Sequence, residues 1–393
     1  MVAPAPTTYA VITGGATSGH VVPALAIIEL LIEAGHAKDC LLYVGSNRGI
    51  ETTLVPPMGV ACMFLSVDGF QRGLSISKLK RNFKMLSLMM RATQKATQIL
   101  VQTRPRVVVS VGGYVSAPIC RAARRLKIPV VTCSYDSQPG LATKMQARYS
   151  AVVAVAQLPS SLPHACLSGA PVRADLRMLD VEATRTAARE RLAFSATDKL
   201  VVVMGGSLGS VVLNNATQTF VTDMDQLVFL NKPISNVSVL HIAGERFMNS
   251  FSLPSVIKRP DGTVAYQRIA YSNQMRDVYA AADVVVSRSG ASTVAEIATV
   301  GVAAILIPWK DAAENHQLTN AKSMTDRGGA VLLEESHLTP ESFTQRVCEL
   351  LADETLRLQL ANSAREIGSA HRNCSIAALV DSVARADVRL ELK

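Results

Sequence analysis

Short runs of apolar, mostly β-branched residues recur along the chain, and most of them lead into a stretch with the spacing of a helix. Examples are YAVITG at 9–14, RVVVSVGG at 106–113, KLVVVMGG at 199–206 and AADVVVSRSG at 281–290. Strands that are apolar throughout and alternate with helices are typical of parallel sheets with both faces covered. The pattern therefore predicts an α/β fold with doubly wound parallel sheets.

The series of strands and helices starts a second time in the middle of the chain. After a charged helical stretch at 180–192, a new strand and glycine turn begin at Leu200. A chain of 393 residues, 49% hydrophobic and 18% charged, is too apolar to be disordered and long enough for two domains. We expect an N-terminal lobe over 1–172, a C-terminal lobe over 173–365 that faces it across a cleft, and a C-terminal helix over 366–393 that returns to the first lobe.

The sequence offers no candidate for a membrane-spanning or secreted segment. The richest apolar stretch, residues 21–34, is interrupted by Glu29 and Glu33, whereas a spanning helix needs roughly 18 consecutive apolar residues. The N-terminal residues lack the basic region of a signal peptide. Seven cysteines, an odd number without CxxC spacing, favour reduced thiols over disulfides or a zinc site. These features are typical of a cytosolic protein.

Positive charge is concentrated in one region of the chain. Between Asp68 and Asp136 there is no acidic residue, while thirteen lysines and arginines fall there. The whole chain has a formal net charge of +9, and the remainder, with 27 basic and 31 acidic side chains, is slightly acidic. The basicity therefore belongs to this region alone.

Part of the basic region has the pattern of an amphipathic helix. Its apolar residues recur at spacings of three and four: Ile76, Leu79, Phe83, Leu86 and Met90. Basic residues occupy the other faces: Lys78, Lys80, Arg81, Lys84 and Arg91. Such a helix either packs its apolar face into the core or docks on anionic lipid. Nucleic acid is disfavoured as a partner, because only 5% of the residues are aromatic and no nucleic-acid module is recognised.

Three glycine-rich turns stand between a predicted strand and a predicted helix, at 14–19, 205–209 and 289–293. In such a turn backbone N–H groups can approach an anion closely, and the helix dipole adds about half a positive charge. None of the three is a Walker A loop or a GxGxxG fingerprint. Tight packing explains any single glycine turn, but three of them at strand ends favour phosphate binding.

Polar residues near these turns are candidates for binding or catalysis. His20, in the first turn of the helix after 14–19, is either a proton acceptor or the partner of a loop carbonyl. Glu296 follows the third turn, where a carboxylate can accept two hydrogen bonds from a ribose diol or simply interact with the helix dipole. Residues 315–317 precede another predicted helix and are either ligands or an ordinary polar cap.

Taken together, these residues resemble the MurG family of bacterial peptidoglycan glycosyltransferases, part of glycosyltransferase family 28. The resemblance spans nearly the whole chain in the family's order and spacing. Its motifs are GGATSGHVVPALA, LYVGSNRGIE, the basic helix, VVVSVGGYVSAP, SGAPVRADL, VVVMGGSLGSVVLN, AADVVVSRSGASTVAEI and IPWKDAAENHQLTNA. The resemblance implies a GT-B fold of two Rossmann-like lobes, with the donor held chiefly by the C-terminal lobe and the lipid acceptor approached through the N-terminal one.

The resemblance also implies an activity and partners. Enzymes of this family transfer N-acetylglucosamine from UDP-N-acetylglucosamine (UDP-GlcNAc) to undecaprenyl-pyrophosphoryl-muramoyl-pentapeptide, which turns lipid I into lipid II. They serve peptidoglycan synthesis, and with it cell shape and division, as peripheral proteins at the cytoplasmic face of the cell membrane. The expected partners are UDP-GlcNAc, the undecaprenyl-linked acceptor, anionic inner-leaflet lipid and other cell-wall enzymes. No cofactor and no obligatory metal are expected, because helix N-termini and Arg173 would stabilise the leaving pyrophosphate and the sequence offers no His/Cys cluster.

Site residues are implied where this sequence matches the family's motifs. Glu296 would hold the ribose hydroxyls and Gln317 the sugar hydroxyls. Ser207 and the N–H groups at 291–293 would hold the pyrophosphate. The implied donor-binding residues are Thr17, Ser18, Gly19, Asp136, Arg173, Ser207, Ser272, Ala291, Ser292, Thr293, Val294, Ala295, Glu296 and Gln317. The implied acceptor-side and membrane-side residues are Gly112, Gly113, Tyr114, Ile76, Leu79, Lys80, Phe83 and Lys84.

The chain departs from the family's pattern at three places. The usual GGTGGH loop reads GATSGH at 15–20, so two glycines have gained side chains. The usual His-Glu-Gln-Asn tetrad reads Cys133-Ser134-Tyr135-Asp136, which puts an aspartate where an asparagine faces the sugar. Its charge is unfavourable beside a pyrophosphate unless a basic neighbour offsets it or it accepts a proton. Ser272 replaces an aliphatic residue that contacts the nucleobase.

The mechanism implied is an inverting displacement. The 4-hydroxyl of the acceptor sugar attacks the anomeric carbon from the face opposite UDP, while helix N-termini and Arg173 stabilise the leaving pyrophosphate. His20 is the first candidate for the general base and Asp136 the second. Two other functions stay open: a GT-B transferase that builds another glycolipid or natural product, and a non-catalytic module that binds nucleotide-sugar or scaffolds cell-wall enzymes at the membrane.

Overall fold

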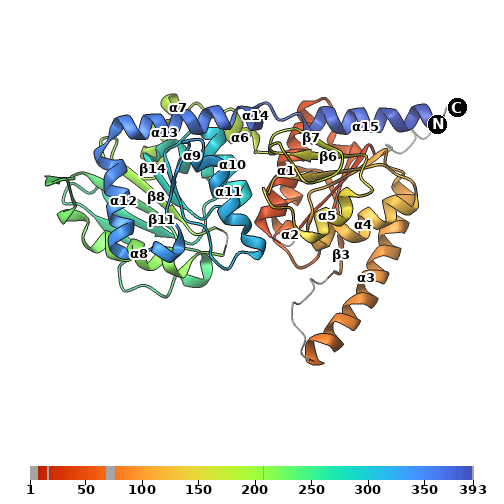
Figure 1. Cartoon of the computed structure of the whole chain (residues 1–393), viewed down its shortest axis with the longest axis horizontal. Coiled ribbons are helices and arrows are strands. Elements are labelled where there is room, and N and C mark those ends of the chain that lie inside the picture. Colours follow the sequence, from red (N-terminus) through yellow and green to blue (C-terminus); the bar gives the residue numbers. More distant parts are fainter. Residues whose placement is uncertain (1–7, 16, 68–75, 207, 392–393) are drawn as a thin grey trace. The chain divides into compact units, whose positions relative to one another are not determined.

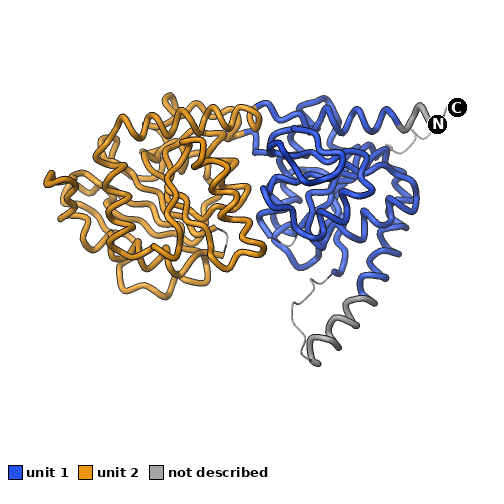
Figure 2. Tube along the Cα trace, viewed as in Figure 1, with its two compact units in different colours: residues 1–174, 373–393 blue, residues 175–372 orange. Residues whose placement is uncertain are grey.

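The computed structural model describes residues 8–15, 17–67, 76–206 and 208–391, with the backbone alone described at 76–87 and 387–391. The chain forms two compact units (Figure 2). Unit 1 consists of Met1–Ala174 and Asn373–Lys393, and unit 2 of Asp175–Arg372. The sequence predicts divisions after residues 172 and 365, and in the structure they fall after residues 174 and 372.

Unit 1 is built on a seven-stranded sheet with strand order β3-β2-β1-β4-β5-β6-β7, and all neighbouring strands are parallel (Figure 1). Its strands are β1 (Ala10–Thr13), β2 (Leu41–Ser46), β3 (Ala61–Leu65), β4 (Val107–Ser110), β5 (Val130–Ser134), β6 (Val152–Val155) and β7 (Ala165–Leu167). The strand order reverses between β1 and β4, where Ile12 pairs with Val109. Such a reversal is the switch point at which open α/β sheets bind ligands.

Helices cover both faces of this sheet. They are α1 (Ser18–Glu33), α2 (Glu51–Leu54), α3 (Ile76–Thr103), α4 (Gly113–Arg125), α5 (Leu141–Ala147) and α15 (Ile376–Glu391). Ile12 and Val109 share a buried cluster with α1 and α15. Val11 and Val108, one residue earlier on each strand, share another with α3 and α4. Successive residues thus face opposite layers, which is why the strands are apolar throughout.

The C-terminal helix α15 is fixed to unit 1 by one carboxylate. Asp381 Oδ1 accepts a hydrogen bond from the Tyr9 hydroxyl at 2.5 Å and lies 2.8 Å from His36 Nε2. The Tyr9 and His36 rings are stacked with their centroids 3.9 Å apart. The helix therefore belongs to the core of unit 1, although unit 2 precedes it in the sequence.

Unit 2 has its own seven-stranded sheet, with strand order β12-β13-β11-β8-β14-β15-β16. Its strands are β8 (Lys199–Met204), β11 (Val237–Ile242), β12 (Val256–Lys258), β13 (Val264–Ile269), β14 (Val284–Ser287), β15 (Ala304–Leu306) and β16 (Val331–Leu332), with a separate hairpin of β9 (Val228–Phe229) and β10 (Lys232–Pro233). Only the edge strand β12 is antiparallel to its neighbour. The order reverses between β8 and β14, so this sheet too has a switch point.

Four of the described helices of unit 2 begin at a side-chain cap. The helices of this unit are α6 (Ala174–Arg177), α7 (Val181–Arg191), α8 (Val211–Thr222), α9 (Met275–Ala281), α10 (Ala291–Val300), α11 (His316–Thr325), α12 (Pro340–Ala352), α13 (Glu354–Ile367) and α14 (Ser369–Arg372). Asp180, Ser210, Thr339 and Asp353 each accept a hydrogen bond from a backbone N–H in the following first turn. Single 3-10 turns are η1 (Lys38–Cys40), η2 (Pro56–Met58), η3 (Met224–Gln226), η4 (Glu245–Phe247), η5 (Ala313–Asn315) and η6 (Glu335–His337).

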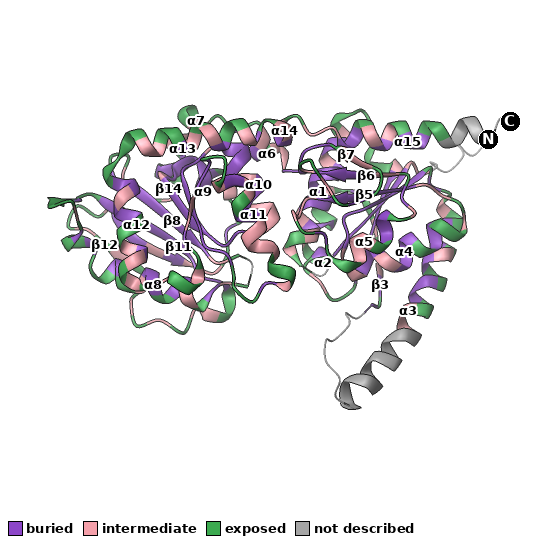
Figure 3. Ribbon diagram, in the orientation of Figure 1, coloured by how far each residue is buried: buried purple, intermediate pink, exposed green. Residues whose placement is uncertain are grey.

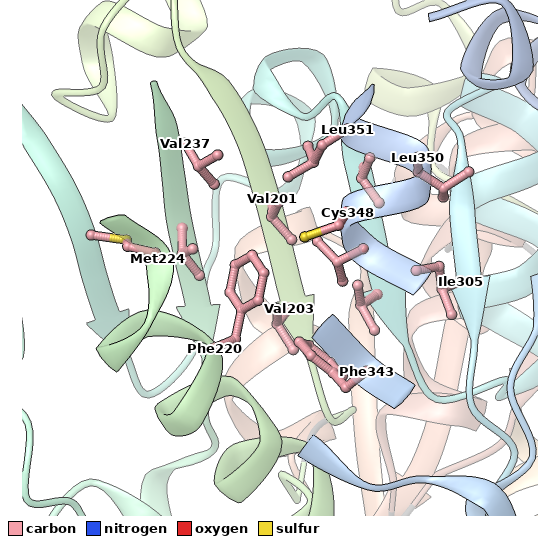
Figure 4. Packing of buried hydrophobic residues seen from close by; sticks show 14 of the residues in the cluster. Val201, Val203, Phe220, Met224, Val237, Ile305, Phe343, Cys348, Leu350 and Leu351 are labelled. Carbon is pink, nitrogen blue, oxygen red and sulfur yellow. The ribbon is translucent and has the colours of Figure 1, made fainter. Parts of the chain in front are cut away.

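The core of unit 2 packs helices α8 and α12 against the sheet (Figure 4). The rings of Phe220 on α8 and Phe343 on α12 meet edge to face, with centroids 5.9 Å apart, beside Val201 and Val203 of β8. Buried strands and exposed outer helix faces recur in both units (Figure 3). The predicted α/β doubly wound fold is confirmed.

The described helices include none that is both long and apolar enough to cross a membrane. The side chains of the predicted membrane face, Ile76, Leu79, Lys80, Phe83 and Lys84, lie outside the described residues. Further along α3, Ala96 and Leu100 pack in the core, whereas Met90 is 55% exposed. The seven cysteines, all within the described residues, form no disulfide, and three of them are buried.

Candidate functional site

The first turn of α1 holds His20 beside the glycine loop that follows β1. Thr17 precedes the helix in an extended conformation, and its Oγ1 lies 3.1 Å from His20 Nδ1. The Thr17 carbonyl accepts hydrogen bonds from the N–H groups of His20 and Val21. The Thr17 side chain makes no cap bond to the helix, so among the described residues it does not compete with a ligand for the N–H groups at the start of α1.

The loop after β4 provides the surface on which the His20 ring rests. Gly112 and Gly113 have positive φ values of 86° and 77°, a region that glycine enters without strain. A Cβ atom on Gly113 would lie 3.3 Å from His20 Nε2 and 3.4 Å from both Cδ2 and Cε1. The glycine pair is therefore needed for the backbone shape and for close approach of the imidazole. Tyr114, the next residue, packs against the cluster under α3 and α4.

The loop after β5 brings Tyr135 and Asp136 close to the first turn of α1. The Tyr135 hydroxyl donates a hydrogen bond to the Gly19 carbonyl at 2.7 Å. Burial lowers the pKa of His20, while the negative charges of Asp136 and Glu51 act in the opposite direction. Burial and the neighbouring Asp136 raise the pKa of Tyr135 well above its usual value, so the phenol stays a donor. The structure thus brings His20, Gly113 and Asp136 together at the switch point.

Glu51 is a functional candidate that the sequence analysis did not single out. It is fully buried at the start of α2, and its Oε1 accepts a hydrogen bond from the Ser46 N–H at 2.8 Å. A Cβ on Gly15 would lie only 2.3 Å from this oxygen, and one on Gly49 only 1.8 Å from Oε2. The glycine loop therefore lies directly on a buried carboxylate. The sequence signal for this residue is an acidic side chain two positions after Gly49, shortly after the end of β2.

In unit 2, the turn after β8 packs backbone against backbone. A Cβ on Gly209 would lie 2.1 Å from the Ala243 carbonyl, and one on Gly244 would lie 2.7 Å from Gly209 Cα. Both glycines have positive φ, 70° and 91°. The Ser210 hydroxyl then caps α8. Ser207, the predicted pyrophosphate ligand in this turn, lies outside the described residues.

The N-terminus of α10 is open. Its preceding residue, Gly290, is extended and provides no side-chain cap. The hydroxyl oxygen of Ser292 is buried and has no hydrogen-bond partner among the described residues. Ala291 and Thr293 are half-buried, whereas Val294 and Ala295 are buried in the core, 8% and 5% exposed. The first turn of this helix can bind an anion through its N–H groups.

Glu296 lies one turn further along α10 and is half-exposed. Its Oε2 accepts a hydrogen bond from the Tyr279 hydroxyl of α9 at 2.9 Å. Ser272, which follows β13, is 8% exposed, and its hydroxyl accepts a hydrogen bond from the Gln274 N–H at 3.1 Å. Both predicted positions therefore stand at the carboxyl edge of the unit 2 sheet.

Gln317 is held against the turn that leads into α10. Its Oε1 accepts a hydrogen bond from the Trp309 N–H at 3.0 Å, and its carbonyl accepts one from the Ser289 hydroxyl at 2.7 Å. Just before it, Glu314 and Asn315 both have φ of 53°, an uncommon conformation for residues with a side chain. Gln317 therefore lies beside the turn at 289–290 that precedes α10.

The candidate residues therefore fall in both units. Those in unit 1 are Thr17, Ser18, Gly19, His20, Gly112, Gly113 and Asp136, with Arg173 apart from them, next to Ala174, whose N–H donates to Glu29 Oε2 at 2.8 Å. The group in unit 2 consists of Ser272, Ala291, Ser292, Thr293, Glu296 and Gln317. Arg173 is half-buried and belongs to unit 1, directly before α6. Within the described residues, no three His, Cys, Asp or Glu side chains are grouped to hold a metal ion.

Two Rossmann-like units with helix N-termini at the carboxyl edges of parallel sheets define the GT-B class of glycosyltransferase folds. Residues 10–155 match the N-terminal domain of glycosyltransferase family 28, and residues 200–375 match its C-terminal domain. The chain belongs to glycosyltransferase family 28, and within it the similar proteins are MurG enzymes. The family resemblance inferred from the motifs is confirmed.

Three similar proteins illustrate this relationship. One from Desulforamulus reducens is 32% identical over 368 residues, which cover 91% of this chain and 94% of the relative. One from Acidothermus cellulolyticus is 34% identical over 378 residues, 96% of this chain and 98% of the relative. Both are named UDP-N-acetylglucosamine--N-acetylmuramyl-(pentapeptide) pyrophosphoryl-undecaprenol N-acetylglucosamine transferase. The crystal structure of Acinetobacter baumannii MurG has a TM-score of 0.67 at 25% identity, covering 96% of this chain and 99% of that one.

Proposed function

We propose that this protein is an inverting glycosyltransferase that moves N-acetylglucosamine from UDP-GlcNAc to the 4-hydroxyl of the muramoyl sugar of undecaprenyl-pyrophosphoryl-MurNAc-pentapeptide, in the step from lipid I to lipid II. The observation that carries the proposal is the match over 96% of this chain and 98% of a relative named for that transfer. The open N-terminus of α10, with Glu296 and Gln317 beside it, is chemically suited to a nucleotide-sugar.

On the donor side, each residue has a part that its chemistry supports. N–H groups at the start of α10 bind the pyrophosphate, where the helix dipole favours negative charge. The Glu296 carboxylate accepts hydrogen bonds from the ribose hydroxyls, and Gln317 binds the hydroxyls of the sugar. Ser207 and Arg173 add to the pyrophosphate site, and the turn at Ser272 adjoins the nucleobase.

On the acceptor side, His20 is the general base. Its pKa is lowered by burial, so the imidazole is neutral near pH 7 and can accept a proton. In the tautomer in which Nδ1–H donates to Thr17 Oγ1, the lone pair is on Nε2, which would lie 3.3 Å from a Cβ on Gly113. The acceptor oxygen forms a bond to the anomeric carbon, the bond from that carbon to UDP breaks, UDP leaves with the electron pair, and His20 takes the hydroxyl proton.

Asp136 stabilises the protonated form of His20 in this scheme. Its charge favours the imidazolium that forms when His20 takes the proton, which offsets part of the cost of burial. The aspartate in place of an asparagine is thus compatible with catalysis. It is also the second candidate for the base if His20 proves dispensable.

We further propose that the protein acts at the cytoplasmic face of the cell membrane and docks there on anionic lipid. Met90 at 55% exposure, Arg91 and Lys95 lie on the outer face of α3. Helix α4 packs beside α3 and adds the exposed Arg121 and Arg124. Basic residues near an anionic surface contribute about 1 kcal/mol each. Cosedimentation with vesicles containing phosphatidylglycerol, but not with neutral vesicles, is the expected result, and other cell-wall enzymes are candidate partners there.

One assay tests the proposed transfer. The purified protein is incubated with labelled UDP-GlcNAc, UDP-glucose or UDP-GalNAc and a short-chain lipid I analogue, and the product's anomeric configuration is read by NMR. Transfer of GlcNAc in a β-linkage is the expected result. Transfer of another sugar would assign the protein to a different GT-B reaction, and UDP binding without turnover would make it a non-catalytic module.

A further inference from the structure

We infer that Tyr279 is a positioning residue for donor binding, acting by orienting the Glu296 carboxylate toward the ribose of a uridine nucleotide. The inference rests on the proposed function and concerns the donor site within unit 2. The Tyr279 hydroxyl donates to Glu296 Oε2 at 2.9 Å, and the two residues come from neighbouring helices, α9 and α10. No motif used in the sequence analysis points to this tyrosine.

The two partners differ in mobility, and this difference indicates which residue positions the other. Tyr279 is fully buried, as are its chain neighbours Val278, Ala280 and Ala281, so its ring has little room to move. Glu296 is half-exposed and carries three rotatable bonds. A fixed phenol that holds a flexible carboxylate selects one rotamer of the carboxylate before the ligand arrives, which reduces the entropy lost on binding.

The bond from Tyr279 is compatible with a ligand on the same carboxylate. An ionised carboxylate has about four lone-pair sites, and the tyrosine hydroxyl uses one of them. A ribose diol requires two. The helix that carries Tyr279 is itself held in place. Arg191 of α7 donates two hydrogen bonds to the Asp277 carboxylate of α9, at 2.6 and 2.7 Å. Tyr279 is therefore a fixed point rather than a side chain that follows Glu296.

The first test is Tyr279→Phe, which removes the hydroxyl and keeps the ring. We expect the donor KM and the Kd for UDP, measured by calorimetry, to rise about tenfold, with kcat within about twofold of the wild type. The matched control is Tyr266→Phe. Tyr266 is another fully buried tyrosine of unit 2, and its hydroxyl lies 3.1 Å from His241 Nδ1, so this variant also loses a buried hydroxyl bond but leaves Glu296 untouched.

The second test separates positioning from a general loss of stability. The Kd of each variant is measured for UDP and for 2′-deoxy-UDP, which lacks one of the hydroxyls that Glu296 would bind. Positioning predicts that the penalty of Tyr279→Phe is strong for UDP and largely absent for 2′-deoxy-UDP, and that Tyr279→Phe adds nothing in a Glu296→Ala background. If Tyr279→Phe does not fold, Glu296→Asp, which shortens the carboxylate arm by one methylene, should show the same ribose-dependent penalty.

The outcomes distinguish this inference from the proposed function. If Glu296→Ala leaves the Kd for UDP unchanged, Glu296 is not a nucleotide ligand and that part of the proposed function is wrong. If Glu296→Ala weakens UDP binding while Tyr279→Phe does not, or if Tyr279→Phe weakens UDP and 2′-deoxy-UDP equally, the positioning role of Tyr279 is overturned while the donor site stands.

Discussion

The hydroxyl of Tyr135 and the carbonyl of Gly19, 116 residues apart in the sequence, are joined by a hydrogen bond of 2.7 Å. The bond ties the loop after β5 to the first turn of α1, immediately before His20. Tyr135 belongs to the tetrad at 133–136, where the resemblance to the family implies a departure from the usual pattern. The tyrosine at this position has a structural role, because its hydroxyl bonds to the Gly19 carbonyl and holds the backbone beside the proposed base.

We predict that Tyr135→Phe lowers kcat about tenfold, because the loss of one hydrogen bond, worth about 1 kcal/mol, lets the His20 turn shift from its reactive position. The midpoint of thermal unfolding should change by only a few degrees, since about 1 kcal/mol moves it by about 2–4 °C in a domain of this size. Steady-state kinetics at saturating donor and acceptor measure the effect. Tyr149→Phe, at a half-buried tyrosine of the same unit, is the control, and equal kcat values for the two variants would remove Tyr135 from this role.

Gly113→Ala should damage catalysis more than stability. The new methyl group would lie 3.3 Å from His20 Nε2, so the imidazole must move by a few tenths of an ångström. Gly35→Ala is a matched control, because Gly35 also has a positive φ, 98°, but nothing lies within 4 Å of its Cβ position. Both variants should lose about 1–2 kcal/mol from the backbone conformation alone. Only Gly113→Ala should lose about tenfold or more in kcat, and similar kcat values would show that the imidazole is not held there.

Asp136→Asn tests the electrostatic part of the mechanism through the pH profile. His20 acts in its deprotonated form, so kcat/KM for the acceptor should rise with pH through the pKa of His20, which burial places below 6.5. The carboxylate of Asp136 raises that pKa, so removing it should move the acidic limb to lower pH. An acidic limb that does not move would mean that Asp136 does not influence the titrating group.

Much of this fold could be predicted from local pattern, because the information is repeated in every strand. Runs such as VVVS at 107–110 and 284–287 are apolar on both faces, and only a sheet covered on both sides can bury them. The glycine turns could be predicted as well, because each of them follows one of these apolar runs. Their geometry adds what the sequence lacked: Gly113 is needed for the His20 ring, and Gly209 for the Ala243 carbonyl.

The contacts that orient the site could not be predicted in this way. The partners Tyr135 and Gly19 belong to elements that become neighbours only through the strand order β1-β4-β5. Tyr279 and Glu296 are 17 residues apart on different helices, and no periodicity relates them. A polar contact between two elements depends on the exact placement of both, and hydrophobic pattern carries no information about it.

The buried His241 should make the free energy of unfolding depend on pH. Burial lowers the pKa of His241 to about 3, and its ring lies between the Tyr266 hydroxyl and Asn214 Oδ1. Below pH 6.5 the unfolded chain binds a proton at this histidine and the native protein does not, so stability falls as the pH falls from 6.5 toward about 3. The slope is at most about 1.4 kcal/mol per pH unit. Urea unfolding midpoints between about pH 7 and 5 measure it. His241→Gln should flatten the slope, and an unchanged slope would assign it to other groups.

The most direct test of the catalytic scheme is the rate of GlcNAc transfer by His20→Ala, measured with UDP-GlcNAc and the lipid I analogue near pH 7.5. We predict a loss of roughly 100-fold or more in kcat with an almost unchanged donor KM, because the general base is lost while the nucleotide site in unit 2 stays intact. A loss of less than about threefold would contradict the assignment of His20 as the base.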